Sequence, residues 1–462
     1  MPAPSAPPPP MPPSSADAIV NTRKVAGWGR YPTVEAELRR ASGATAVASP
    51  IAPGQSLIAR GNGRSYGDAS LHQRTMLDMR GLDRLVDFNP DTGLIACEAG
   101  LLLADLITLM LPRGWWVPVT PGTKLVTIGG MVASDVHGKN HHGAGTFCDH
   151  VTWIDLALGD GQILRCSRTE HADLFAATCG GMGLTGIILR VAFTMIPVES
   201  ATMRQRRLRA PSLAHAIAAF EESQDWTYSV AWIDCLATGA SLGRSAILLG
   251  EHARRDELPL EAREAPLARA QRRAKTIPVD MPGFVLGRLS VSIFNKLYYA
   301  AQRPGDALVQ LEPYFYPLDA IHEWNRIYGR SGFVQYQCVL PLEASQAGYE
   351  RILAEIAAVG QASFLAVLKR MGRQSFGMLS FPMEGYTLAL DFPATPVNLA
   401  LLDRIDAIML DHGGRLYLAK DARASSATIA AGYPRLDEFR AVRRRYGLED
   451  RFSSLLSQRL AL

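Results

Sequence analysis

The sequence predicts an α+β protein with two folded domains, and three observations support this prediction. The chain has 462 residues, of which 48% are hydrophobic and 20% charged, so it is long enough for two domains with a large buried core. Short β-type segments separated by glycines continue to about Pro197. From about Glu199, aromatic β-type segments alternate with helical ones. We therefore expect one domain over residues 21–198, a second over 199–410, and a C-terminal segment over 411–462.

The elements of the first domain are predicted from the spacing of apolar residues and the positions of glycine and proline. Residues 102–111 carry apolar side chains at helical spacing before Pro112, which predicts an amphipathic helix that stops there. Residues 151–158 and 162–167 flank a Gly-Asp-Gly turn and predict a β-hairpin. Residues 172–178 predict a short helix, and residues 184–198 predict a buried strand that leads out of the domain.

The second domain begins with an arginine-rich segment, 203–209. Aromatic, β-branched segments at 227–235 and 332–341 predict strands, and residues 349–360 predict a helix. We therefore expect an antiparallel sheet capped by helices.

Composition excludes several classes of protein. The net charge of +4 is too small to indicate nucleic-acid binding, and the six cysteines form no CxxC pair, so we expect reduced thiols rather than disulfides or a zinc ribbon. Residues 1–20 are proline-rich, with neither the positive nor the apolar region of a signal peptide, which predicts a disordered tail and a cytoplasmic protein. No apolar run reaches the roughly 18 residues that a membrane span needs.

Peripheral membrane contact is a further hypothesis, for the region 254–299. Arg269, Arg272, Arg273 and Lys275 precede a segment rich in Phe, Leu and Ile, a combination that suits an anionic lipid surface or a lipid-phosphate substrate. The alternative is a solvated helix followed by an ordinary buried segment.

One of two informative segments is a glycine loop at residues 60–68, RGNGRSYGD, after a short apolar run. Gly61, Gly63 and Gly67 lack a Cβ, so their backbone amides can approach a phosphate and form an anion-binding nest. A dinucleotide-binding βαβ motif would need an amphipathic helix next, but a polar stretch and a second short strand at 76–79 follow. A plain surface loop is the other alternative.

A second segment, residues 121–145, PGTKLVTIGGMVASDVHGKNHHGAG, concentrates glycines, hydroxyls and imidazoles beyond what a packed core needs. His137 and His141 have the i,i+4 spacing of two metal ligands on a helix. No neighbouring Cys or carboxylate beyond Asp135 completes such a site, and the glycines disfavour a helix, so we predict no metal. His142 is interpreted as a hydrogen-bonded loop histidine.

Further motifs are GGMGLTGII, EWNRIYG, QYQ, LSFP, LDFP and GGRLYLAKDAR. With these motifs and the two segments above, the chain from about Trp28 onward resembles the FAD-binding oxidases of the vanillyl-alcohol oxidase type. Within them it is most similar to the enzymes that oxidise a polyprenyl-phosphoryl ribose. The resemblance implies a two-domain PCMH-type fold, with residues 21–198 binding FAD, residues 199–410 binding substrate, and residues 411–462 returning to the FAD domain.

The resemblance also implies the reaction: FAD-dependent oxidation of the 2-hydroxyl of a polyprenyl-phosphoryl-β-D-ribofuranose to the 2-keto intermediate, the first half of epimerisation to the arabinose donor. It implies an NADH-dependent keto-reductase partner, a quinone or similar electron acceptor, and a place in the cytoplasm or at the inner face of the membrane. The alternatives are a sugar, alditol or lactone oxidase of the same flavin family, and a noncatalytic flavoprotein assembly subunit.

By the same resemblance, one set of residues holds the cofactor: Gly61, Gly63, Arg64, Ser65, Tyr66, Gly67, Gly122, Thr123, Thr127, Gly129, Gly130, Ser134, His137, Gly138, Gly183, Ile188 and Tyr417. Many relatives attach FAD to a histidine at the place of Arg64 or Asp68, so the flavin here is expected to be noncovalent. Met182 stands where close relatives carry asparagine.

The catalytic residues implied are Lys420, Tyr66 and His137. Lys420 would orient the hydroxyl, stabilise negative charge on the reduced flavin and, with a depressed pKa, accept the hydroxyl proton; Tyr66 is the alternative base. An ordinary salt bridge from Lys420 to Asp421 is the competing interpretation.

The substrate residues implied are Lys139, Trp232, Tyr314, Gln335, Gln337, Lys369, Thr387 and Ala389. Gln335 and Gln337 alternate in a strand and so face one side. A solvated lysine at 139 and core aromatics at 232 and 314 are the alternatives. Ala389 replaces a cysteine of some relatives, so covalent trapping of nitroaromatic inhibitors there is excluded, and Thr387 replaces an asparagine.

Overall fold

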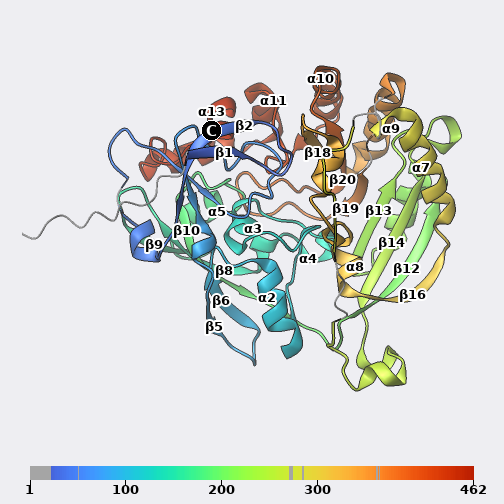
Figure 1. Ribbon diagram of the computed structural model, residues 1–462, viewed down its shortest axis with the longest axis horizontal. Coiled ribbons are helices and arrows are strands. Elements are labelled where there is room, and N and C mark those ends of the chain that lie inside the picture. The colour runs from blue at the N-terminus through green and yellow to red at the C-terminus, as the bar shows by residue number, and fades with distance from the viewer. Residues whose placement is uncertain (1–21, 50, 270–273, 283–285, 361–362, 364) are drawn as a thin grey trace, which may run out of the picture.

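The structure is a computed structural model that describes residues 22–49, 51–269, 274–282, 286–360, 363 and 365–462. Its two larger sheets, of five and eight strands, form two halves with helices packed around them (Figure 1). The predicted proline-rich tail, together with Arg272 and Arg273 of the basic stretch, lies outside the described residues.

The first half contains a mixed four-stranded sheet and an antiparallel five-stranded sheet. The four-stranded sheet has the order β1 (Thr22–Ala26), β2 (Thr33–Arg40), β4 (Thr75–Asp78), β3 (Ile58–Arg60). The five-stranded sheet has the order β5 (Leu85–Phe88), β6 (Leu94–Glu98), β10 (Ile187–Thr194), β8 (Val151–Ala157), β9 (Ile163–Ser167). The pairing of β8 with β9 confirms the predicted hairpin.

The second half is one antiparallel sheet of eight strands. The sequence predicted an antiparallel sheet here. Its order is β16 (Gly305–Gln310), β12 (Thr202–Ala210), β14 (Ser245–His252), β13 (Tyr228–Ile233), β19 (Ala366–Met371), β20 (Gly385–Pro393), β18 (Phe333–Pro341), β21 (Arg415–Leu416). Two short pairs complete the β structure: β7 (Trp115–Trp116) with β11 (Ile196–Pro197), and β15 (Lys275–Thr276) with β17 (Ile321–His322).

The α-helices of the first half are short: α1 (Ala44–Val47), α2 (Leu103–Met110), α3 (Ile128–Ala133), α4 (His141–Ala144) and α5 (Ala172–Thr178). Those of the second half are α6 (Leu213–Glu221), α7 (Arg288–Ala301), α8 (Leu311–Phe315), α9 (Leu342–Val359) and α10 (Pro396–Asp411). The last three are α11 (Ser426–Gly432), α12 (Leu436–Arg445) and α13 (Leu455–Leu460). As predicted, α2 ends before Pro112; α9 ends at Gly360, whose φ of +72° is the left-handed cap that glycine favours.

The two faces of the eight-stranded sheet differ because side chains alternate along each strand. Helices α6, α9 and α10 pack against one face, where Arg370 and Tyr386 both donate to the Glu221 carboxylate at 2.9 and 2.5 Å. Their strand neighbours Lys369 and Thr387 therefore point toward the opposite face. That opposite face looks toward the first half of the molecule.

The C-terminal segment joins the two halves. Its strand β21 pairs with β18 at the edge of the eight-stranded sheet, so residues 415–416 contribute to the sheet of the second half. Beyond it, the Tyr417 hydroxyl donates to the Ser134 carbonyl (2.7 Å), and α12 packs against α5 in the first half (Figure 1, red and green).

Within the part of the chain that the structure describes, no helix combines the length and the apolar character needed to cross a membrane.

Candidate active site

One cavity of about 750 Å³ lies against the open face of the eight-stranded sheet. This volume is within the range of about 300–1,000 Å³ that is usual for small-molecule sites. Its lining comes from the glycine loop at 61–66, from residues 120–139 and 182–188, from the sheet and from Tyr417 to Lys420. The fold thus brings together segments that are hundreds of residues apart.

Most of the predicted cofactor residues line this cavity: Gly61, Gly63, Arg64, Ser65, Tyr66, Gly122, Thr123, Thr127, Gly129, Gly130, Ser134, His137, Gly138, Gly183, Ile188 and Tyr417. Gly63 has a φ of +63°, a conformation that glycine adopts without strain. A Cβ built on Gly122 meets nothing within 4 Å, so this glycine borders open space. A wall without side chains is what a closely bound ligand requires.

Gly67, unlike the other two glycines of the predicted nest, is not among the residues that line the cavity, and its contact with the cofactor stays a prediction. A Cβ on Gly67 would collide with the backbone carbonyl of Asp421. Its function is close packing of the glycine loop on the C-terminal segment, where the Tyr66 amide also donates to the Ala419 carbonyl at 3.1 Å.

Lys420 projects into the cavity with its ammonium nitrogen 3.9 Å from the centroid of the Tyr66 ring. Burial lowers the pKa of Lys420 to about 7; the buried Asp391 carboxylate opposes this effect, and Lys369 adds to it. The predicted alternative, a salt bridge to Asp421, is wrong, since Asp421 pairs with Arg459 at 2.9 Å.

Asp391 does not line the cavity, but its carboxylate acts on Lys420, and sequence reasoning missed it. It accepts hydrogen bonds from the Gln335 amide (2.5 Å) and the Tyr328 hydroxyl (3.4 Å), and burial raises its pKa to about 7. Strand alternation was the available signal, because Asp391 lies two residues after Ala389 in β20 and so shares its face.

Two further buried lysines, Lys139 and Lys369, line the same cavity. Burial lowers the pKa of Lys139 to about 7, with repulsion from Lys369 as a second cause, and burial lowers that of Lys369 to about 8. Lys139 donates to the carbonyls of Tyr314 and Phe315 and so is not a solvated surface lysine. The lining holds five Lys or Arg side chains, Arg64, Lys139, Arg207, Lys369 and Lys420, against two carboxylates, Asp319 and Glu323, so the site favours an anionic ligand.

His137 is held in one tautomer. The Gln337 side-chain amide donates to His137 Nε2 at 3.0 Å and to Thr387 Oγ1 at 3.3 Å, so Nδ1 carries the hydrogen, and it has no protein partner. Burial, followed by repulsion from Lys369, holds the His137 pKa well below its usual range, so the ring is neutral. Thr387 does not line the cavity; it donates to the Cys338 carbonyl and lies behind Gln337.

The remaining predicted substrate residues, Trp232, Tyr314, Gln335 and Ala389, all line the cavity. Trp232 packs on Tyr298 of α7, with ring centroids 4.8 Å apart. Sequence reasoning also missed Gln205, Arg207, Phe294 and Tyr298, which line the end of the cavity formed by β12 and α7. The only signals were strand position for Gln205 and Arg207 and an aromatic, apolar segment for Phe294 and Tyr298, and neither shows how far a cavity extends.

No cluster of three or more His, Cys, Asp or Glu side chains with metal-binding geometry occurs among the described residues. His137 precedes α4, so it does not share a helix with His141. His141 Nδ1 accepts from the Gly372 amide (2.9 Å), and His142 Nε2 bonds to the Trp226 carbonyl (2.8 Å).

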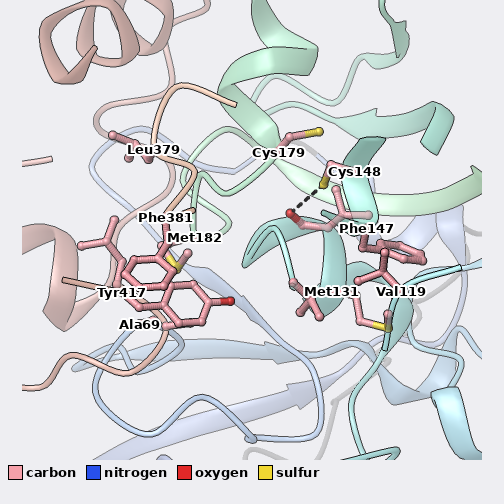
Figure 2. Close-up of a cluster of buried hydrophobic side chains, with 14 of the residues drawn as sticks. Ala69, Val119, Met131, Phe147, Cys148, Cys179, Met182, Leu379, Phe381 and Tyr417 are labelled. Carbon is pink, nitrogen blue, oxygen red and sulfur yellow. Dashed lines mark hydrogen bonds between the residues drawn. The ribbon is translucent and has the colours of Figure 1, made fainter. Parts of the chain in front are cut away.

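All six cysteines are free and buried, and none lines the cavity. The Cys148 thiol donates to the Val132 carbonyl at 3.5 Å. Figure 2 marks this bond at Cys148 with a dashed line and shows Cys179 nearby. In the same view the rings of Phe381 and Tyr417 stack, with centroids 4.8 Å apart, which fixes the Tyr417 ring at the cavity wall.

Comparisons with known proteins agree with this geometry. The FAD binding domain family matches residues 35–167. Decaprenylphosphoryl-β-D-ribose oxidase of Mycolicibacterium smegmatis is 37% identical over 459 residues, covering 97% of this chain and the whole of that protein. The chain belongs to this family of FAD-binding oxidoreductases.

Two other relatives match less of the chain. An uncharacterised protein of Streptomyces coelicolor is 35% identical over 374 residues, covering 78% of this chain and all of that protein. L-gulonolactone oxidase of Mus musculus is 30% identical over 139 residues, or 30% of this chain and 31% of that enzyme.

The cavity of this family member fits its cofactor, FAD. The open space at Gly122 and the glycine wall leave room for a diphosphate. Three buried polar atoms of lining residues, Arg64 Nε, His137 Nδ1 and Arg207 Nε, have no hydrogen-bond partner among the described residues. Met182 also lines the cavity and has a φ of +53°, a conformation that asparagine adopts more readily, so this departure carries local backbone strain.

Proposed function

We propose that this protein oxidises the 2-hydroxyl of a polyprenyl-phosphoryl-β-D-ribofuranose to the 2-keto sugar, as the name of its 37% identical relative suggests. The observation that carries the proposal is the meeting of Lys139, Lys369 and Lys420 in one buried cavity. A lining of five Lys or Arg side chains against two carboxylates suits a substrate that brings its own negative charge, and a phosphodiester supplies it.

The predicted cofactor residues are proposed to hold FAD, with the diphosphate against the glycine wall and Tyr417 and His137 near the flavin. The flavin is proposed to be noncovalent, because Arg64 and Asp68 stand where many relatives carry the attaching histidine. Bound FAD would supply the acceptor for the hydride from C2.

Lys420 is the proposed base. Its depressed pKa, about 7, leaves a large neutral fraction near pH 7 that can accept the hydroxyl proton. Burial, together with Asp391, raises the pKa of Tyr66 well above its ordinary value, so the phenol keeps its proton and is a poor base. Tyr66 instead presents its ring to the Lys420 ammonium.

The other side chains position the sugar. Lys139 and Lys369 are proposed to bind the phosphate, and the His137 Nδ1 hydrogen is available to donate to the flavin or the sugar. Gln335 and Gln337 lie on the same face of β18, next to the proposed reacting hydroxyl. Trp232 and Tyr314 would then contact the lipid end.

The cellular context is part of the proposal. The keto product calls for an NADH-dependent reductase to complete inversion to arabinose, and the reduced cofactor calls for a quinone or similar acceptor. We place the protein in the cytoplasm, at the inner face of the membrane. A lactone or alditol oxidase is the second candidate, and its support is the similarity to L-gulonolactone oxidase over 139 residues.

The test is an anaerobic titration of the purified flavoprotein. Acid precipitation should release the flavin, and polyprenyl-phosphoryl ribose should bleach its visible band, whereas L-gulonolactone and alditols should not. A flavin that stays oxidised with the phospholipid sugar but bleaches with a lactone would replace the proposal by the second candidate.

A further inference from the structure

Helix α7 (Arg288–Ala301) exposes large apolar side chains that a water-facing helix does not normally carry. Leu289, Ile293 and Leu297 are 75%, 50% and 66% exposed. They recur every four residues, so they form one stripe along the helix. Figure 1 places α7 (yellow) at the periphery of the second half, away from the first.

The opposite side of α7 is firmly packed, so the exposed stripe is not a consequence of a detached helix. Val291 and Asn295 are buried, and the Asn295 amide donates to Asp234 at 2.7 Å. The Tyr299 hydroxyl donates to the Ala210 carbonyl at 3.2 Å, at the end of β12.

The stripe continues into the cavity. Phe294, next to Ile293, is 38% exposed and also lines the cavity, as does Tyr298 one turn later. One helix therefore presents an apolar surface both to the outside and to the end of the cavity that lies farthest from Lys420 along the sheet.

Charge around this helix is strongly one-sided. Arg288 and Lys296 on α7 and Arg303 just after it are exposed, and residues 288–303 contain no Asp or Glu. A positive segment with an exposed apolar stripe complements an anionic lipid surface.

We propose that α7 docks on an anionic lipid bilayer, with Leu289, Ile293 and Leu297 among the acyl chains and the basic residues at the head groups. The prenyl chain of the substrate then passes from the bilayer along Phe294 and Tyr298 into the cavity; this second part rests on the proposed function. The substrate need not leave the membrane completely.

Docking is tested by flotation of the full-length holoprotein with vesicles of phosphatidylcholine containing 30% phosphatidylglycerol. Combined Leu289→Glu, Ile293→Glu and Leu297→Glu should weaken binding at least tenfold. The matched control combines Ile163→Glu, Leu342→Glu and Val397→Glu, three exposed apolar positions elsewhere, and should bind as wild type. The flavin spectrum and melting temperature verify that both variants fold.

Equal vesicle binding by the two triple variants, or no binding by wild type, would overturn the proposal and leave the α7 surface to a protein partner. Equal binding to pure phosphatidylcholine would overturn the role of charge. A second assay separates docking from the proposed function: the α7 variant should reduce its flavin normally with a short-chain, detergent-soluble substrate and at least tenfold more slowly with a vesicle-embedded one. Vesicle binding without flavin reduction by either substrate would contradict the proposed function and still support docking.

Discussion

Replacing Arg459 by leucine should loosen the cavity without touching its lining. The Arg459 guanidinium bonds both oxygens of Asp68, at 3.0 and 2.9 Å, and pairs with Asp421 at 2.9 Å. Both carboxylates are almost fully buried and repel one another, which is one cause of the raised Asp68 pKa, after burial itself. Without the cation, the loop that ends at Asp68 and the segment beside Lys420 are pushed apart.

The expected size follows from the burial of these groups. Removing one partner of a buried ion pair costs about 3–5 kcal/mol. An unfolding entropy of about 2.1 cal/mol/K per residue, over 462 residues, gives roughly 1 kcal/mol/K, so the melting temperature should fall by about 3–5 °C. Arg459→Leu should also release FAD more readily on gel filtration.

Arg351→Leu is the matched control, because Arg351 forms an exposed pair with Asp411 (3.6 Å) that is worth about 1 kcal/mol or less. Its melting temperature should stay within about 1 °C of wild type on the same scale. If Arg459→Leu has the same melting temperature as the control and retains its FAD, the buried ion pair does not hold the two segments together.

Three further predictions concern the site directly. Lys420→Met should keep FAD but slow anaerobic flavin reduction by about 10²-fold or more, which is the usual contribution of a positioned base. A stopped-flow rate near that of wild type would exclude Lys420 as the base. Because the Lys420 pKa is lowered to about 7, flavin reduction should accelerate as pH rises through about 7. Asp391→Asn should move this rise to lower pH, because the carboxylate favours the ammonium form of Lys420. An unmoved pH profile would rule out the coupling of Asp391 to Lys420. Gly122→Val should weaken FAD binding, measured by calorimetric titration, at least tenfold and leave the melting temperature of the apoprotein unchanged, because its Cβ enters open space in the cavity wall. Gly143→Ala is the control, because Gly143 also faces open space but does not line the cavity.

Local pattern was sufficient for the elements whose signal lies within a few residues. The hairpin of β8 and β9, helix α2 before Pro112 and the alternation of Gln335 and Gln337 were all predictable, since each depends on spacing and turn chemistry. Motif resemblance then supplied the glycines, lysines and glutamines of the cavity lining, but not the end formed by β12 and α7.

The remainder depends on contacts between distant parts of the chain. Nothing near β19 indicates that it lies between β13 and β20, or that β21 adds to the same sheet. Sequence could not show that Gly67 packs on Asp421, because a glycine that admits a ligand and one that admits another backbone look alike in sequence. For the segment that forms α7, composition showed that Phe, Leu and Ile are abundant but could not tell whether anything covers these side chains.

The linkage of Asp68 to Arg459 also constrains how the molecule is assembled. The two residues are 391 positions apart, and the hydrogen bond from Gln337 to His137 spans 200. During synthesis, N-terminal parts generally fold first, while contacts of such separation form late. The glycine loop is therefore made early but has no opposite wall until the C-terminal segment emerges. Flavin insertion then belongs to the end of biogenesis, when FAD meets a nearly finished chain and shifts it toward the closed form by mass action.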